Sequence, residues 1–236
     1  MTVELGPRLK TVASFLEGVT LLCDVGSDHA YLPVYAIQQG LIINAIAGEV
    51  VKGPFESARQ TVQDYVLNDK ISVRLGDGLD VVTSNDQVTA ISICGMGGEL
   101  ISRILEAGYN GGHLNGRERL ILQPNVAEHF VREWLMNHSY HIVEETVVED
   151  NHRLYEIIVA EPVDKRVEYT ELELKYGPIL LKESSELSVA KWNRMNRKNK
   201  EILEQLQKSE TPQHEKIEQF EKAFNELQGV IDRANS

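Results

Sequence analysis

Residues 20–33, with the sequence TLLCDVGSDHAYLP, join a mainly apolar run to a helical stretch through a short turn that contains glycine. The run Thr20–Val25 is of the kind that forms a strand buried on both faces. Gly26 allows a sharp turn, and the helical stretch continues as far as Gly40. A strand, a glycine turn and a helix in this order are typical of the first unit of a doubly wound α/β sheet.

The alternation of strand and helix continues to about residue 160. Further strands are expected at Ile43–Glu49, Ile71–Gly76, Thr89–Cys94 and Arg119–Gln123, and further helices near Pro54, at Gly98–Ala107 and at Val126–His138. Apolar strands that alternate with helices indicate a parallel sheet covered on both faces. His141–Val148 and Arg153–Ala160 are joined by only the segment Glu149–His152, so we expect an antiparallel hairpin at the end of the sheet.

Beyond the predicted sheet the composition shifts toward Glu, Lys, Leu and Gln, and the pattern becomes helical. Steps of four and three residues along Leu181–Leu206 and along Ile217–Ile231 predict two long helices with facing seams. Thr211-Pro212 is expected to break the helix between them. We therefore expect two domains, residues 1–162 and residues 163–236, and the second is an antiparallel coiled-coil hairpin within one chain.

Charge and cysteine content restrict the class of protein. The net charge of the 236 residues is −12, and residues 1–162 carry 22 acidic and 11 basic side chains, so a polyanion would have to meet local basic patches. No apolar stretch approaches the roughly 20 residues of a membrane span, and MTVELGPRLK lacks the layout of a signal peptide. Cys23 and Cys94 form neither a disulfide framework nor a zinc site, which favours a cytoplasmic protein.

Acidic residues and glycines stand at the predicted carboxyl ends of four strands. They are Asp24 and Asp28 after the first strand, Glu49 after the second, Gly76-Asp77-Gly78 after the third and Gly95-Met96-Gly97 after the fourth. Because parallel strands end at one edge of a sheet, these residues are expected to line one cleft. Acidic groups are poor neighbours for a pyrophosphate, and the G-x-G-x-x-G pattern of dinucleotide sites is absent, whereas a sulfonium cofactor with an ammonium group suits them.

Single motifs from this set allow plainer readings. Glu49 can accept both hydroxyls of a ribose, and Asp77 can hold an adenine amino group, but a Gly-Asp-Gly segment is often only a turn. The loop that contains Gly26 could also be only a turn followed by a helix cap. The prediction of a cofactor cleft depends on the conjunction of all four strand ends.

Six motifs together resemble the bacterial tRNA (adenine-22-N1)-methyltransferase family. They are DVGSDHAYLP (24–33), GEV (48–50), GDGL (76–79), CGMGG (94–98), LQPN (122–125) and EDNHRLYEI (149–157). The resemblance covers essentially the whole chain. It implies a class I methyltransferase domain, Rossmann-like with seven strands, that uses S-adenosylmethionine to methylate N1 of adenine 22 in tRNA. No metal is expected.

Two positions depart from the general class I pattern. Asp28 and Ala30 stand where the signature D-x-G-x-G-x-G has glycines, and the segment 94–98 lacks the D/N-P-P-Y motif of many amino-group methyltransferases. Both departures agree with the narrower family that the six motifs resemble.

The cofactor site follows from the strand ends and the resemblance. Its expected members are Asp24, Gly26, Ser27, Asp28, His29, Glu49, Val50, Gly76, Asp77, Gly78, Cys94, Gly95, Met96 and Gly97.

Asp28, Tyr31 and Asn125 are the candidate catalytic residues. The carboxylate of Asp28 could favour the positive charge that develops on the adenine, or it could cap the helix that starts near Ala30. Tyr31 could stack on the target base or pack in the core. Asn125 could contact the adenine edge or only follow a turn.

Contacts with RNA are expected from local positive charge. The segment 191–200, KWNRMNRKNK, contains five basic residues and no acidic one. The candidate RNA contacts are Arg8, Lys10, Lys191, Arg194, Arg197, Lys198 and Lys200. Basic side chains on a helix can neutralise phosphates, although a solvated helix face has the same composition.

Three other functions remain open from the residues alone. A methyltransferase could act on another RNA. A nicotinamide-dependent oxidoreductase would share the sheet and the ribose-binding Glu49, and a non-catalytic RNA-binding module could retain only the pocket. The expected protein is a monomer with tRNA as its partner and no membrane association.

Overall fold

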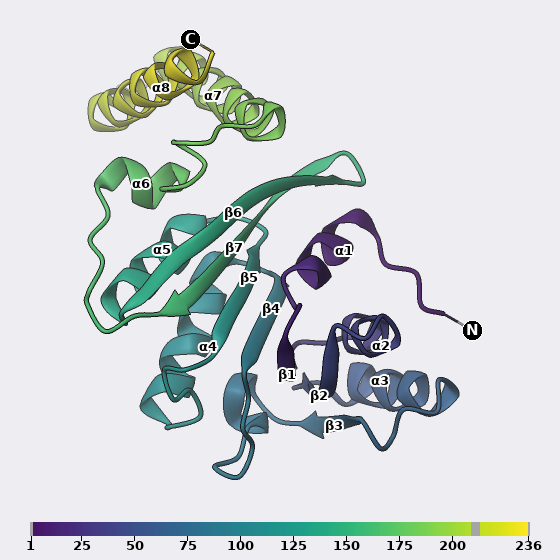
Figure 1. Cartoon of the computed structure of the whole chain (residues 1–236). Coiled ribbons are helices and arrows are strands. Elements are labelled where there is room, and N and C mark those ends of the chain that lie inside the picture. The colour runs from purple at the N-terminus through teal and green to yellow at the C-terminus, as the bar shows by residue number, and fades with distance from the viewer. Residues whose placement is uncertain (1, 209–212, 236) are drawn as a thin grey trace. The chain divides into compact units, whose positions relative to one another are not determined.

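The computed structural model describes residues 2–208 and 213–235, and the chain divides into two compact units (Figure 1). The first unit is Met1–Pro178 and the second is Ile179–Ser236. Residues 163–178, whose composition groups them with the helical end of the chain, thus belong to the compact unit that contains the sheet.

Seven strands form one sheet in the first unit. They are β1 (Val19–Val25), β2 (Ile42–Glu49), β3 (Ile71–Leu75), β4 (Ala90–Met96), β5 (Arg119–Pro124), β6 (Tyr140–Asp150) and β7 (Arg153–Pro162). Their order is β3-β2-β1-β4-β5-β7-β6 (Figure 1). β1 to β5 pair in parallel, whereas β7 is antiparallel to both β5 and β6. The predicted fold class is confirmed. The strand order reverses at β1, and ligands of doubly wound sheets bind at such a point.

Helices cover both faces of this sheet (Figure 1). On one face lie α1 (Pro7–Ser14), α2 (Tyr31–Gln38) and α3 (Lys52–Asp64), and on the other lie α4 (Gly98–Asn110) and α5 (Glu128–Asn137). The first three helices contribute Val12, Leu32 and Val62 to a core that also contains strand residues. Three short helices were not expected: α1, the 3-10 helix η1 (Gly78–Val81) and α6 (Glu171–Tyr176). Pro7 is a signal for α1, because proline suits the first helical turn.

The hairpin between β6 and β7 is tighter than expected. The loop predicted over Glu149–His152 is wrong, because Asp150 pairs with Arg153 and only Asn151 and His152 form the turn. Both turn residues have positive φ, 49° and 61°. A two-residue turn with two left-handed residues matches the twist of antiparallel strands, which allows pairing to continue to the end of the hairpin.

In the second unit, α7 (Glu186–Gln207) begins later than the heptad pattern predicts. The Ser185 hydroxyl accepts a hydrogen bond from the Ser188 N–H at 3.1 Å, and the Ser185 N–H donates to the Ser188 hydroxyl at 2.8 Å. This reciprocal cap starts the helix, so the expected continuation of the seam back to Leu181 is wrong.

α8 (His214–Ala234) packs against α7 as the expected helical hairpin. The side chain of Asn196 donates a hydrogen bond to the side chain of Gln228 at 3.0 Å. The turn expected at Thr211-Pro212 lies outside the described residues. In the part of the chain that the structure describes, no helix is long and apolar enough to cross a membrane.

A buried arginine joins the end of the first unit to its sheet. Arg132 on α5 donates to Glu145 of β6 at 2.7 Å and to Glu156 of β7, and it also donates to the carbonyl oxygens of Leu174 and Lys175 on α6. Burial alone would lower the pKa of the guanidinium, but the two carboxylates outweigh it and raise this pKa. Arg132 therefore holds residues that follow the sheet in the same compact unit.

Substitution of Arg132 by alanine is expected to lower the free energy of unfolding by about 3–5 kcal/mol, because two buried carboxylates lose their ion pairs with the guanidinium. Urea denaturation measures this loss. Alanine at the exposed Arg166 serves as the control and should change the free energy of unfolding by less than about 0.5 kcal/mol. Combined replacement of Arg132, Glu145 and Glu156 by Met, Leu and Leu should recover most of the loss, and an equally unstable triple variant would contradict the assignment.

Candidate functional site

Two adjoining cavities open where the carboxyl ends of β1, β2 and β4 meet. The polar cavity, of about 350 Å³, lies against the loop after β1 and against α1, and it includes Asp24, Ser27 and Arg8. The apolar cavity, of about 160 Å³, lies between the ends of β2 and β3 and the helix α4. Gly26 and Met96 belong to both cavities. Every expected cofactor residue except Gly97 lines one of them.

The side chain of Met96 lies directly over Gly26, where the two cavities meet. A Cβ atom at position 26 would overlap the terminal methyl group of Met96. The φ of Gly26 is also positive, +69°, so the loop requires glycine for both its backbone conformation and its contact.

The loop after β1 turns its backbone N–H groups toward β2. The N–H groups of Gly26 and Ser27 donate to the Gly48 carbonyl oxygen at 3.0 and 3.2 Å, and the N–H of Asp28 donates to the carboxylate of Glu49. The Ala30 N–H donates to Ser27. The bonds from Gly26, Ser27 and Asp28 hold the loop against the end of β2, where Glu49 lines the apolar cavity.

Asp28 and Ala30 each have a φ of +56°, the left-handed conformation that glycine adopts easily. The two departures from the class I glycine pattern therefore occupy glycine-like backbone. α2 begins at Tyr31 with Ala30 as its N-cap and without a side-chain cap, so the alternative that Asp28 caps this helix is wrong. The carboxylate of Asp28 lies 3.7 Å from Nε2 of His29 and borders the polar cavity.

Asp24 is buried at the end of β1. Its two carboxylate oxygens accept hydrogen bonds from the hydroxyls of Ser27 and Ser92, each at 2.6 Å. Burial raises the pKa of Asp24, and the two hydroxyls oppose this rise. Burial, together with Asp24, also raises the pKa of the Cys94 thiol in the same cavity, which keeps the thiol protonated. Sequence reasoning missed Ser92, because one serine in an apolar strand carries no functional signal.

Glu49 ends β2 beside the apolar cavity, and Leu100 and Ile104 of α4 lie across it. Burial raises the pKa of Glu49, and the hydrogen bond from the Asp28 N–H opposes this effect. Leu100 and Ile104 were also missed, although their i, i+4 spacing after the glycines at 97 and 98 places both on one helix face.

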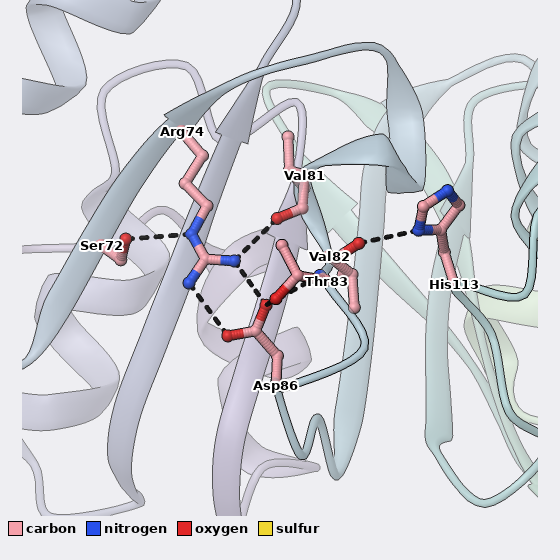
Figure 2. A network of polar contacts seen from close by, with 7 residues as sticks. All are labelled: Ser72, Arg74, Val81, Val82, Thr83, Asp86 and His113. Atoms are coloured by element: carbon pink, nitrogen blue, oxygen red, sulfur yellow. Dashed lines mark hydrogen bonds and ion pairs between the residues drawn. The ribbon is translucent and has the colours of Figure 1, made fainter.

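A polar network fastens the segment after β3, which carries Asp77 (Figure 2). Arg74 donates to the carbonyl oxygen of Val81 at 2.8 Å and forms a bidentate ion pair with Asp86 at 2.5 and 3.0 Å. Asp86 also accepts from the N–H and the hydroxyl of Thr83, both at 2.8 Å. Val81 in turn packs on Gly48, where a Cβ atom would come within 2.9 Å of its methyl group. Arg74 therefore positions the floor of the apolar cavity from outside it.

A second network links β4, β5 and α1. The buried Gln123 accepts hydrogen bonds from the Gly95 N–H, at 3.0 Å, and from the Arg8 guanidinium, and it donates to the side chain of Asn125 at 3.1 Å. Asn125 donates to the carbonyl oxygen of Gly95 at 2.6 Å. The guanidinium of Arg8 also lies over the ring of Tyr155, 5.4 Å from its centroid. Gln123 was not predicted, and Arg8, predicted as an RNA contact, lines the polar cavity.

Tyr31 and His29 form a stacked aromatic pair beside the polar cavity, with ring centroids 5.1 Å apart. Tyr31 is 43% exposed, so the alternative that it packs in the core is wrong. Of the other basic residues expected to contact RNA, Lys191 is half-buried, and the exposed ones are Lys10, Arg194, Arg197, Lys198 and Lys200. Within residues 2–208 and 213–235, no group of three His, Cys, Asp or Glu side chains could hold a metal ion.

A family model described as tRNA (adenine(22)-N(1))-methyltransferase matches residues 22–229 of the chain. The chain belongs to this family. The Bacillus subtilis tRNA (adenine(22)-N(1))-methyltransferase is 41% identical to it, and the match covers 98% of both chains.

Solved structures of family members agree with the fold. A Streptococcus pneumoniae protein in complex with S-adenosyl-L-methionine is 41% identical with a TM-score of 0.86, and the match covers 95% of this chain and 98% of that one. The family member from M. capricolum in complex with S-adenosyl-homocysteine is 25% identical with a TM-score of 0.85, and the match covers 97% and 98% of the two chains.

Replacement of Asp86 by asparagine is expected to lower the free energy of unfolding by about 1–2 kcal/mol at pH 7, discounted for partial exposure. The ion pair with Arg74 lowers the pKa of Asp86 in the folded state. It therefore contributes fully above about pH 4, the ordinary aspartate range, and is lost as the pH falls through the lowered folded-state pKa. Denaturation at several pH values should show the two proteins converging in acid, whereas the exposed Asp69→Asn control should follow the unmodified chain throughout.

Proposed function

We propose that this protein transfers a methyl group from S-adenosylmethionine to N1 of adenine 22 in tRNA. The observation that carries the proposal is the ring of acidic groups at the ends of β1, β2 and β3 around two joined cavities. Membership of the tRNA (adenine(22)-N(1))-methyltransferase family supports both the reaction and the substrate.

The donor set of the two cavities fits this cofactor. Glu49 accepts the ribose hydroxyls, and Asp77 accepts the adenine amino group beside the apolar surface of Leu100 and Ile104. Asp28, at the polar cavity, offers a carboxylate to the ammonium group. S-Adenosylmethionine, when bound, supplies the electrophilic methyl group.

The chain's own task at the target base is alignment and charge stabilisation. N1 of adenine has an in-plane lone pair, so no residue has to remove a proton before the attack. The site must hold N1 in line with the transferred methyl group and exclude water. Asp28 borders the polar cavity, and its carboxylate favours the positive charge that develops on the purine.

The target adenine must leave its base pair, because N1 lies on the Watson–Crick edge. The stacked rings of Tyr31 and His29 offer an exposed aromatic surface for the unstacked base. Asn125 has its amide orientation set by Gly95 and Gln123, and its remaining donor and acceptor positions suit the adenine edge.

Exposed basic side chains supply the RNA contacts in this proposal. Arg194, Arg197, Lys198 and Lys200 on α7, with Lys191 and with Lys10 on α1, neutralise phosphates and position the tRNA without reading its sequence. Residues 1–162 hold the cofactor and residues 163–236 carry most of the RNA contacts. We further propose a cytoplasmic monomer, and light scattering of the purified protein at the mass of two chains would contradict the monomer.

The nicotinamide alternative is disfavoured by the loop after β1. A pyrophosphate site needs outward-facing backbone N–H groups, but those of Gly26, Ser27 and Asp28 already donate to Gly48 and Glu49. A non-catalytic module would have no reason to keep Asp28 in a left-handed conformation beside the cavity, because such backbone is strained.

The proposed reaction predicts a primer-extension stop at adenine 22 after incubation of unmodified tRNA transcripts with the protein and labelled S-adenosylmethionine. A methyl group on N1 blocks pairing, so the stop reports the cofactor, the substrate and the position together. Incorporation without this stop would move the target base, and cofactor binding without any incorporation would reject tRNA as the substrate. In the same assay, at saturating S-adenosylmethionine, Asp28→Ala should lower kcat about 10- to 100-fold, and unchanged turnover would remove its catalytic role.

Reversal of charge at Arg194, Arg197 and Lys198 to glutamate is expected to raise the apparent KM for tRNA at least about tenfold and to reduce its salt dependence. The cofactor affinity should stay unchanged. The matched control reverses Lys216, Lys222 and Arg233, exposed basic residues of α8, with the same change in net charge. An equal effect of the two triple variants would assign the change to overall charge and reject α7 as the contact.

A further inference from the structure

Arg8 reaches the polar cavity from a segment that precedes the sheet. The cavity is formed by Arg8, Asp24 and the loop at Ser27 together with the end of β4. A Cβ atom at Gly95 would lie 3.4 Å from Nη1 of Arg8, so the guanidinium packs directly on the end of β4. α1 thus closes one side of the cavity with a positively charged group.

Two fixed contacts orient this guanidinium. Nη1 donates to the side chain of Gln123, and the central carbon of the guanidinium lies over the ring of Tyr155. Gln123 is fully buried, and its oxygen also accepts from Gly95, so the amide cannot turn without loss of both bonds. Within residues 2–208 and 213–235, no hydrogen bond engages Nε or Nη2 of Arg8, which leaves a donor edge available.

The cavity otherwise has few donors for an anion. The N–H groups of Gly26, Ser27 and Asp28 donate to β2, and the hydroxyl of Ser27 donates to Asp24. The N–H of Gly95 donates to Gln123. Among the described residues that line the polar cavity, Arg8 is the only lysine or arginine, while Asp24 and Asp28 are both acidic.

S-Adenosylmethionine carries a carboxylate next to its ammonium group, and the acidic side chains suit only the ammonium. A carboxylate placed beside Asp24 and Asp28 without a cation would be repelled. A guanidinium with an uncommitted edge binds a carboxylate through charge-assisted hydrogen bonds.

We infer that Arg8 is the residue that holds the methionine carboxylate of S-adenosylmethionine, with Gln123 as its positioning residue. This inference rests on the proposed function and changes the expected role of Arg8 from an RNA contact to a cofactor ligand. The N-terminus of α2, with the backbone N–H groups of Tyr31 and Leu32, is the alternative binding site for the carboxylate.

The test compares two ligands that differ only in the carboxylate: S-adenosylmethionine and its decarboxylated form. Isothermal titration calorimetry measures their Kd values for the unmodified chain, for Arg8→Ala, and for Arg59→Ala as a control at an exposed arginine of α3. Arg8→Ala is expected to raise the Kd of S-adenosylmethionine about 10- to 100-fold and that of the decarboxylated form less than threefold. Arg59→Ala should change neither. Arg8→Lys, which keeps the charge but loses the fork, should be intermediate.

Each other outcome overturns the inference. An equal rise in the Kd of both ligands would make Arg8 a structural residue. No change in either Kd would favour the N-terminus of α2 as the binding site of the carboxylate. A rise in the KM for tRNA with both Kd values unchanged would show that Arg8 contacts the RNA and not the cofactor. If the unmodified chain bound neither ligand, the proposed function itself would fail. If the unmodified chain binds S-adenosylmethionine and methylates tRNA, the proposed function stands, and the Arg8 variants then test only the role of Arg8.

Discussion

Asp24 brings a carboxylate into the buried edge of the sheet, and its two oxygens accept hydrogen bonds from Ser27 and Ser92. A buried carboxylate without such partners would be costly, so its burial requires both hydroxyls. One hydroxyl belongs to the loop after β1 and the other to β4, the strand beside β1. The same interaction therefore holds the loop after β1 against the sheet and places an acidic side chain in the wall of the polar cavity.

The seating of this loop decides what the cleft can bind. Because the N–H groups of Gly26, Ser27 and Asp28 turn toward β2, the cleft lacks the anion-binding backbone that dinucleotide proteins use at the same place. Glu49 accepts one of these bonds and so is held at the end of its strand. The carboxylates at this edge favour a positively charged nucleoside. A carboxylate on the same ligand needs a cation, and Arg8 is placed in the polar cavity to provide it.

Supports outside the cleft keep its walls in place. The ion pair between Arg74 and Asp86 holds the segment after β3 (Figure 2). Val81 of this segment packs on Gly48, so the ion pair also supports the end of β2. Arg132 has the same role at the far end of the sheet, where it ties α6 to the hairpin. In both ion-pair networks one arginine contacts several groups of the segment that it holds, so the loss of that arginine affects the whole segment.

The sequence by itself determined the strand and helix pattern, the terminal hairpin and the acidic residues at the strand ends. These are local properties, and parallel strands necessarily bring their carboxyl ends to one edge. Only the tertiary structure decided the roles of Arg8, Ser92 and Gln123, because each depends on a partner far away in the chain; Arg8 and Gln123 are 115 positions apart. It also removed the helix-cap reading of Asp28, since the loop is held by backbone bonds to β2, which no local pattern records.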